Sequence, residues 1–268
     1  MWSALSTTSR PKCPRRILWP CVRRCWSMAT TSTERRRREL KELFATIQSR
    51  FRTVRHTLAF GPYRIRILRL ADPDALLDQI TEEEFQQEER LPYWAELWPS
   101  SIGLARHIWR WVECAGQPVL ELGCGLGLAG LIAAQKGGEV TFTDYEPDAL
   151  LFARYHALLN RCPSVHFRLL DWRHPDLEAS FPWVIASDVL YEKQNVSLLF
   201  SCVQRFLLPG GTFILADPYR PAAAGFFRLM AREGYRLRRT VQPVTLDQSL
   251  SWIGIYEFTR EETGKGRG

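Results

Sequence analysis

Groups that could do chemistry stand at the ends of four successive predicted strands. The first is the glycine turn in Val119–Gly130 (VLELGCGLGLAG), followed by Asp144, by Asp171 with Trp172, and by Ser187 with Asp188. The carboxyl ends of parallel strands meet at one edge of an open α/β sheet, and ligands bind there. Four such groups in register indicate a site for a nucleoside-type ligand.

The glycine turn joins an apolar strand to an apolar helix. Glycine at 123 and 125 permits positive φ and close approach of the backbone to a ligand, which any side chain would block. The helix that follows directs its N-terminal N–H groups at the same place. The turn is therefore the centre of the predicted site.

The acids and the tryptophan after the glycine turn each have a second interpretation. Asp144, 21 residues after Gly123, can accept both hydroxyls of a ribose, or it can cap the helix expected to begin near Pro147. Trp172 can stack on an adenine ring or merely cover the sheet edge. Asp171 can accept from an adenine amino group or cap a turn.

Two nucleoside ligands compete for this turn. Gly125, Gly127 and Gly130 satisfy the dinucleotide fingerprint G-x-G-x-x-G, which is weak on its own. An NAD site would need a group for hydride transfer, and we find no acid or base placed for one. S-adenosylmethionine would use the earlier glycines, with Glu121 two residues before them, and we favour it.

The elements that must position these groups alternate between short apolar strands and helices. Strands are expected at 119–122, 139–143, 165–169, 183–186, 212–216, 235–241 and 252–259, and helices after the glycine turn and at 147–159, 196–208 and 221–233. This alternation predicts an α/β fold with a seven-stranded, mostly parallel sheet, helices on both faces and an antiparallel final strand.

The chain before the glycine turn is expected to pack on this core. A helical pattern covers 34–50, one or two strands cover 51–70, and the acidic stretch 71–90 is expected to be helical in part. Tyr93, Trp94 and Trp98 then precede a helix that can begin at Pro99. Aromatic residues of this kind are usually core, but three on an irregular segment can also form a ligand wall.

These patterns divide the chain into four predicted parts. Residues 1–33 form an extension, 34–115 pack on the core and cover the active site, 116–260 form the ligand-binding core, and 261–268 are a frayed tail. The extension is rich in Arg and contains no acid, as transit peptides do. It can also be disordered, or translated from an upstream start with Met28 as the true first residue.

The net charge and the cysteine spacing bear on the partners and the cellular compartment of the protein. The net charge is +7, but residues 1–40 hold ten basic and two acidic groups, leaving 26 basic and 27 acidic groups in the other 228 residues. The charge of the chain therefore does not indicate a nucleic-acid partner. Seven scattered cysteines argue against a disulfide framework and suggest the cytoplasm, or mitochondria if the extension is a transit peptide. We expect no membrane-spanning segment, no metal and a monomer.

The motifs resemble a known family. ELGCGLG at 121–127 resembles the E/D-x-G-x-G-x-G motif of seven-strand S-adenosylmethionine-dependent methyltransferases, whose fold is the Rossmann-like class I fold. ELWPSSIGLA at 96–105, LDW at 170–172 and SDVLY at 187–191 together resemble the protein-lysine methyltransferases among them. PYWAELWPSS at 92–101 and ADPYRP at 216–221 are most similar to the branch that methylates the electron-transfer flavoprotein β subunit.

The resemblance implies a role for each matched residue and a protein substrate. Asp188 and Tyr191 would face the acceptor amine. The cofactor would be held by Trp98 at its methionine end, by Glu121, Gly123, Cys124 and Gly125 around the turn, by Asp144 at the ribose, by Asp171 and Trp172 at the adenine, and by Ser187 beside it.

Two other functions remain open from the residues. A small-molecule N-methyltransferase of the nicotinamide type would have a closed acceptor pocket, whereas a protein methyltransferase would have a wide mouth. A non-catalytic module that binds the cofactor and a partner would not need Asp188 and Tyr191.

Overall fold

The computed structural model describes residues 19–72 and 93–260, and their side chains from residue 33 onward. Most of the predicted acidic stretch 71–90, half of the predicted extension and the predicted tail lie outside the described residues. Contacts divide the chain into two units, Met1–Glu42 and Leu43–Gly268. The predicted boundaries at 33, 115 and 260 stay predictions. Within the described part, no helix has the length and apolar character needed to span a bilayer.

The first helix, α1, runs from Trp19 to Arg50 and so starts earlier than predicted. Pro20 stands in its first turn, where a missing N–H is tolerated, and no Gly or Pro follows before Arg50. The Ser and Thr residues at 30–33 weaken helical propensity but do not end the helix. In the second unit, Ile47 is fully buried and Phe51, just after α1, packs edge-on against Phe152.

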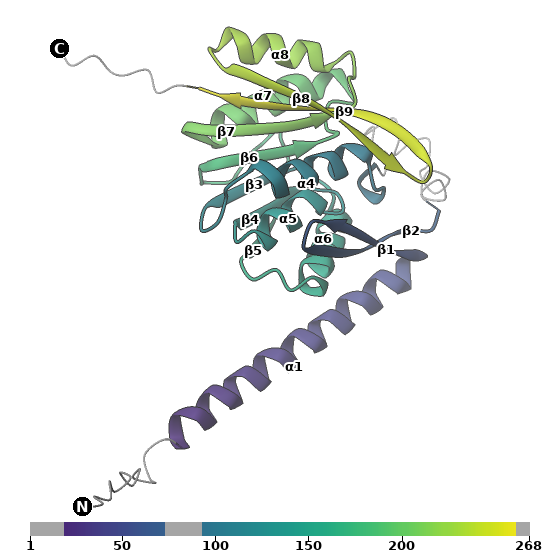
Figure 1. The fold of residues 1–268 in the computed structure, drawn as a ribbon, viewed down its shortest axis with the longest axis vertical. Helices are drawn as coiled ribbons and strands as arrows, with labels where there is room; N and C mark the ends of the chain where they lie inside the picture. Colours follow the sequence, from purple (N-terminus) through teal and green to yellow (C-terminus); the bar gives the residue numbers. More distant parts are fainter. Residues whose placement is uncertain (1–18, 73–92, 261–268) are drawn as a thin grey trace, which may run out of the picture. The chain divides into compact units, whose positions relative to one another are not determined.

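The second unit is built on a seven-stranded sheet with the order β5-β4-β3-β6-β7-β9-β8 (Figure 1). The strands are β3 (Pro118–Leu122), β4 (Glu139–Asp144), β5 (Val165–Leu169), β6 (Phe181–Ser187), β7 (Leu207–Asp217), β8 (Arg236–Leu246) and β9 (Ser249–Thr259). β3 to β7 are parallel, and β9 is antiparallel to both of its neighbours. The predicted seven-stranded, mostly parallel sheet with an antiparallel final strand is confirmed.

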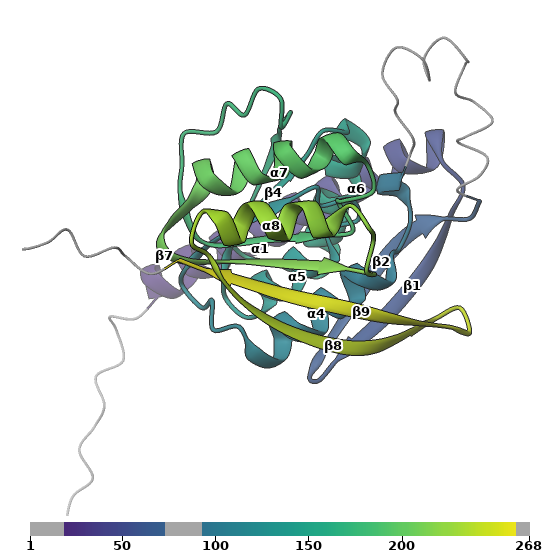
Figure 2. The same ribbon diagram turned by 90° about the horizontal axis from the view of Figure 1, so that it is seen from above.

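Helices cover both faces of this sheet. They are α4 (Pro99–Trp111), α5 (Leu128–Gln135), α6 (Pro147–Leu159), α7 (Lys193–Phe206) and α8 (Ala223–Arg232). α7 and α8 lie on one face, and α4 and α5 on the other (Figure 2). All of α5 except Gln135 is buried, because it is apolar all round and is packed between the sheet and its neighbours.

Within the seven-stranded sheet, the largest differences from the predicted boundaries lie at the start of β7 and at the β8–β9 hairpin. α7 ends at Phe206 because Leu207 pairs with Phe181 of β6, and β7 starts there rather than at 212. β8 and β9 extend beyond the predicted strands into a hairpin closed by Asp247 and Gln248, with φ of 46° and 67°. A two-residue turn of this kind needs positive φ at both positions and usually contains glycine, and neither Asp247 nor Gln248 signals it.

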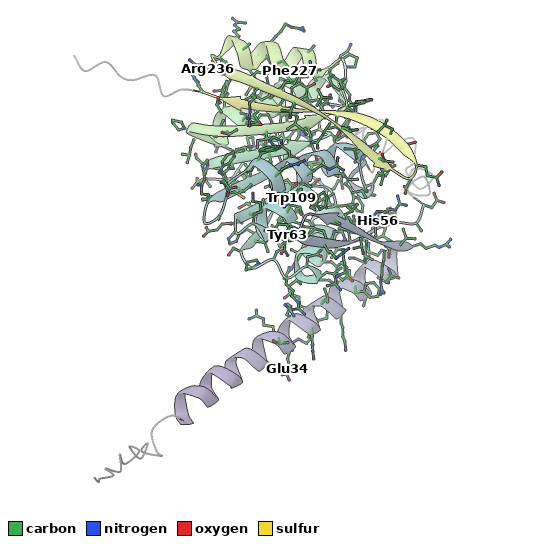
Figure 3. The ribbon with its side chains drawn as sticks, in the orientation of Figure 1. Glu34, His56, Tyr63, Trp109, Phe227 and Arg236 are labelled. Carbon is green, nitrogen blue, oxygen red and sulfur yellow. The ribbon has the colours of Figure 1, made fainter. Side chains whose placement is uncertain are left out.

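A separate hairpin formed by β1 (Thr53–Phe60) and β2 (Tyr63–Leu70) packs on the α4–α6 layer. The Leu68 N–H donates to Nε2 of the buried His156 on α6 (2.8 Å). The indole of Trp109 on α4 lies against Gly61 in the hairpin turn, beside the labelled Tyr63 (Figure 3). A short 3₁₀ turn at Tyr93–Ala95 then leads into α4.

Candidate active site

A cleft with a volume of about 240 Å³ opens at the carboxyl ends of β3, β4 and β6, and the segment before α4 forms one wall. Ten of the eleven predicted site residues line it: Trp98, Gly123, Cys124, Gly125, Asp144, Asp171, Trp172, Ser187, Asp188 and Tyr191. The structure therefore brings together groups that are spread over almost 100 positions of the sequence.

The glycine turn presents bare backbone to the cleft. Gly123, Gly125 and Gly127 have φ of 64°, 50° and 77°, a region that other residues adopt with strain. A Cβ on Gly125 would lie 3.2 Å from the carbonyl oxygen of Trp94, so a side chain there would crowd this wall. Cys124 between them is buried, and burial raises the pKa of its thiol, so it is not a reactive nucleophile.

Glu121 is the predicted site residue that does not reach the cleft. Its buried carboxyl lies beneath the turn, where Oε2 accepts a hydrogen bond from the N–H of Gly130 on α5 (3.1 Å). Burial raises its pKa to about 8, with a smaller contribution from the nearby Asp144. Glu121 thus ties β3 to α5 rather than facing a ligand.

Asp144 receives two backbone hydrogen bonds at the end of β4. The Gly125 N–H donates to Oδ2 (2.8 Å) and the Glu146 N–H donates to Oδ1 (3.0 Å). Each oxygen has a second lone pair, so the carboxylate can still accept from ligand hydroxyls. Burial raises the pKa of Asp144 despite these bonds. Glu146, not Asp144, is the N-cap residue of α6.

Asp171 lies in a hydrogen-bond network with Arg173 and Tyr145, neither of which was predicted from the sequence as a site residue. Arg173 holds the Asp171 carboxylate through Nε–Oδ1 (2.9 Å) and Nη2–Oδ2 (2.8 Å), and it also donates to the Tyr145 hydroxyl (2.8 Å). These bonds keep the pKa of Asp171 below its usual value. Trp172 stands beside this network, 3.5 Å from the place a Cβ of Gly123 would occupy. An arginine two residues after the acid was the available signal.

Tyr93, Trp94 and Trp98 all line the cleft. Trp98 donates from Nε1 to the Tyr93 carbonyl (2.8 Å), and the Tyr93 ring meets that of Tyr191 edge-on at 5.0 Å. Trp94 also packs edge-on against the buried Phe152, with ring centroids 5.4 Å apart. The two interpretations of these aromatic residues therefore both apply to Trp94, which borders the cleft and contacts the core.

Asp188 and Tyr191 follow β6 and also line the cleft. Asp188 is 8% exposed, has a φ of 61°, and donates its N–H to the Ala216 carbonyl (2.9 Å). Its carboxylate pairs closely with the guanidinium of Arg220. Tyr191 is 45% exposed. Partial burial of its hydroxyl, together with the nearby charge of Glu192, raises the pKa of this group to about 12. Arg220 belongs to the ADPYRP motif, but the motif alone predicted no role for it.

This arrangement can hold a nucleoside against glycine backbone, with hydroxyl acceptors at Asp144 and an aromatic face at Trp172. A polar acceptor can then approach between Asp188 and Tyr191. The described residues contain no group of three His, Cys, Asp or Glu side chains placed to hold a metal ion.

The known proteins that this chain resembles are methyltransferases, in agreement with the geometry of the cleft. A family model described as lysine methyltransferase matches residues 81–233. The chain is 30% identical over 156 residues to EEF1A lysine methyltransferase 3 of Mus musculus, covering 55% of this chain and 66% of that protein. It is 33% identical over 106 residues to the histone-arginine methyltransferase METTL23 of Homo sapiens, covering 37% of this chain and 56% of that protein. The chain thus spans between half and two thirds of these relatives.

A solved structure shares the fold. The magnesium protoporphyrin IX methyltransferase of Synechocystis PCC 6803 superimposes with a TM-score of 0.50 at 16% identity, over 70% of this chain and 97% of that one. The class I methyltransferase fold expected from the sequence is confirmed.

Proposed function

The chain belongs to the lysine methyltransferase family, and on this premise we propose that it transfers methyl groups from S-adenosylmethionine to lysine ε-amines of a protein. The observation that supports this most is the cleft itself. The same cleft is lined by the glycine turn, Asp144, Asp188 and Tyr191, and this supports an acceptor site beside a nucleoside site.

The residues present fit the cofactor. Bare backbone at Gly123 and Gly125 permits close approach, and the N-terminus of α5 follows at Leu128. Asp144 would accept the ribose hydroxyls, and Trp172 would lie against the adenine. Trp98 would pack against the methionine end. When bound, the cofactor supplies a methyl group on a positively charged sulfur.

The acceptor must be a neutral amine. The lone pair of the amine nitrogen forms the new N–C bond while the C–S bond breaks. The electron pair of the C–S bond stays on sulfur, and a proton passes from the nitrogen to water. Free lysine has a pKa of about 10.4 and arrives protonated, so the site must favour loss of that proton. Alignment of nitrogen, methyl carbon and sulfur can lower the barrier by up to roughly 7–11 kcal/mol.

Asp188 and Tyr191 would position the amine. Asp188 offers carboxylate oxygens that accept an N–H hydrogen bond, and the raised pKa of Tyr191 keeps its hydroxyl protonated at neutral pH. Tyr93 borders the same place, where an aromatic face tolerates methylammonium products by cation–π contact.

We propose the electron-transfer flavoprotein β subunit as the first substrate to test. The motifs PYWAELWPSS and ADPYRP support it. The names of the relatives support other protein substrates, namely elongation factor 1A and histone, and one relative acts on arginine.

The test is transfer of a labelled methyl group from S-adenosylmethionine. Purified protein is incubated with the electron-transfer flavoprotein β subunit, elongation factor 1A, histones and a cell extract in separate reactions. We expect label in a protein band that is lost with Asp188→Ala. Label only in the small-molecule fraction would indicate the nicotinamide-type alternative. Cofactor binding without transfer would indicate the non-catalytic module.

We also propose that the protein is a cytoplasmic monomer that binds no nucleic acid. The near-neutral charge of residues 41–268 supports the absence of a nucleic-acid partner, and the scattered cysteines support the cytoplasm. Fluorescent fusions beginning at Met1 and at Met28 test the location, and we expect both to be cytoplasmic. Accumulation of the Met1 fusion alone in mitochondria would contradict this and show that residues 1–27 are needed for a transit signal.

A further inference from the structure

Three charged side chains meet at the ends of β6 and β7. Ser187 and Ala216 are paired in the parallel ladder, so the residues that follow them, Asp188 and Asp217, lie side by side. The chain then turns at Tyr219, whose φ is 67°, and Arg220 returns between the two acids. We call Asp188, Asp217 and Arg220 the acid–arginine triad.

Arg220 contacts both acids of the triad. Its backbone N–H donates to Oδ1 of Asp217 (2.7 Å), and its Nη1 lies 3.8 Å from Oδ2 of the same residue. The same Nη1 pairs closely with Oδ1 of Asp188. One guanidinium therefore serves two carboxylates on neighbouring strands.

Burial makes this arrangement energetically significant. Asp217 is fully buried and Asp188 nearly so, whereas the Arg220 side chain keeps 26% of its surface exposed. Two buried carboxylates repel each other, and a cation between them compensates. Burial raises the pKa of Asp217 to about 6 even with Arg220 present. Without Arg220, the repulsion between the two buried carboxylates would lose this compensation.

The pairing changes what Asp188 can do to an amine. An unpaired carboxylate would favour the ammonium form of lysine and raise its pKa, which opposes a reaction that needs the neutral amine. With Arg220 bound, much of that charge is neutralised, yet the carboxylate oxygens keep lone pairs for an N–H donor. A paired Asp188 thus orients the amine without trapping it as ammonium.

We propose that Arg220 is a positioning residue of the transfer reaction, which fixes the Asp188 carboxylate and offsets its charge so that the acceptor lysine binds as the neutral amine. This inference rests on the proposed function. It assigns a role to a residue that lies outside the lining of the cleft and acts only through Asp188.

Other charged groups share the cleft and stay unchanged in the test below. They are Glu96, Asp144, Glu146, Asp171, Arg173 and Glu192. None of them is altered by substitution of Arg220, so a change in pH dependence reports on the triad.

The first experiment measures the ion pair without any substrate. Urea unfolding of wild type, Asp188→Asn, Arg220→Met and the double variant forms a double-mutant cycle. We expect the folding equilibrium constants to show at least a tenfold coupling. Additive effects would show that the pair does not form in solution, and would overturn the inference alone.

The second experiment measures initial transfer rates against pH. The probes are labelled S-adenosylmethionine with the recombinant electron-transfer flavoprotein β subunit and, in parallel, a cell extract. For Arg220→Met we expect the rising limb of kcat/KM to move about one to two pH units higher, the effect of a unit charge roughly 6–12 Å away at an effective dielectric constant of about 20. Cofactor affinity should stay within about threefold, since Arg220 does not line the cleft.

Two variants serve as controls. Arg220→Lys keeps a cation between the acids, and we expect it to restore most of the wild-type profile. Arg228→Met removes an exposed arginine of α8 and should leave the profile unchanged. An unshifted Arg220→Met profile, or an equal shift in Arg228→Met, would contradict the positioning role while leaving the proposed function standing. A wild-type protein that transfers no methyl to any protein would overturn both.

Discussion

Asp144 and Asp188 are two aspartates at the same sheet edge, and their different surroundings suit them to different roles. Both are nearly buried, but Asp144 is bound by two backbone N–H groups and Asp188 by a guanidinium. The first environment leaves an anion with free lone pairs beside the glycine turn. The second leaves a partly neutralised acceptor beside Tyr191. Substitutions of the two acids should therefore affect different steps.

Asp144→Ala should weaken cofactor binding by at least about tenfold, the loss of one or more hydrogen bonds to a charged group. Isothermal titration with S-adenosylmethionine measures it. Asp148→Ala is the matched control, because Asp148 in the first turn of α6 pairs with Arg50 and does not line the cleft. Equal affinity for wild type and Asp144→Ala would mean that the ribose is held elsewhere.

Glu121→Gln should remove a pH-dependent loss of stability. The folded-state pKa of Glu121 is about 8, above its ordinary value of 4.5, so the folded protein binds this proton more tightly than the unfolded chain does. The free energy of unfolding of wild type therefore falls as pH rises from about 4.5 to about 8. Relative to wild type, the Gln variant should gain on the order of 1–3 kcal/mol between pH 5 and pH 9.

Urea unfolding at pH 5, 7 and 9 measures this gain. Glu139→Gln, at the exposed start of β4, is the control and should show no comparable trend. A difference between wild type and Glu121→Gln that stays constant with pH would show that Glu121 is ionised in the folded protein.

At the scale of elements, two helical glycines differ in their surroundings. A Cβ on Gly130 of α5 would lie 2.5 Å from Phe142 and would also collide with the Glu121 carboxyl, whereas a Cβ on Gly225 of α8 would meet nothing closer than 3.6 Å. Gly130 thus allows α5 to lie close on β3 and β4. The last glycine of the G-x-G-x-x-G pattern is explained by packing and gives no support to NAD.

Alanine substitutions at Gly130 and Gly225 should have opposite effects on stability. Gly130→Ala should lower the free energy of unfolding by about 1–3 kcal/mol through overpacking. Gly225→Ala should raise it by up to about 1 kcal/mol, since alanine favours helix and restricts the unfolded chain. Chemical denaturation of both variants checks this, and a neutral Gly130→Ala would mean that α5 can shift away from the sheet.

Elements with a marked chemical beginning were predictable. α6 has its predicted bounds because Pro147 opens it and its apolar face is regular, and β3 to β5 agree within a residue. The tip of the β8–β9 hairpin was not predictable, because Asp247 and Gln248 adopt positive φ without a glycine to signal it. The start of β7 depends on pairing with Phe181, which is a tertiary contact.

At the scale of the molecule, the site is assembled from one sheet edge and the segment before α4. The residues at the strand ends were predictable, because parallel strands bring their carboxyl ends together. The Arg173 and Arg220 pairings were not, since each depends on where a loop returns. Glu121 was placed by its motif, but a side chain of β3 can point beneath the turn instead of into the cleft.

Removal of residues 1–33 should leave the second unit intact. Ile47 and Phe51 keep their buried contacts in such a chain, and none of the cleft residues is removed. We expect the thermal midpoint to stay within about 2 °C, less than the shift that 1 kcal/mol produces in a domain of this size. Ile47→Ala in the same truncated chain is the comparison, and it should lower the midpoint by several times as much. A large drop from truncation alone would show that residues 1–33 stabilise the core.

We propose a lysine nitrogen of a protein as the methyl acceptor, and mass spectrometry of the labelled product identifies that atom. Wild type and Asp188→Ala are incubated with labelled S-adenosylmethionine and each protein substrate, and the modified peptides are fragmented. We expect a labelled methyl group on a lysine side chain with wild type only. A methyl group on arginine or histidine, or equal lysine labelling by Asp188→Ala, would contradict it.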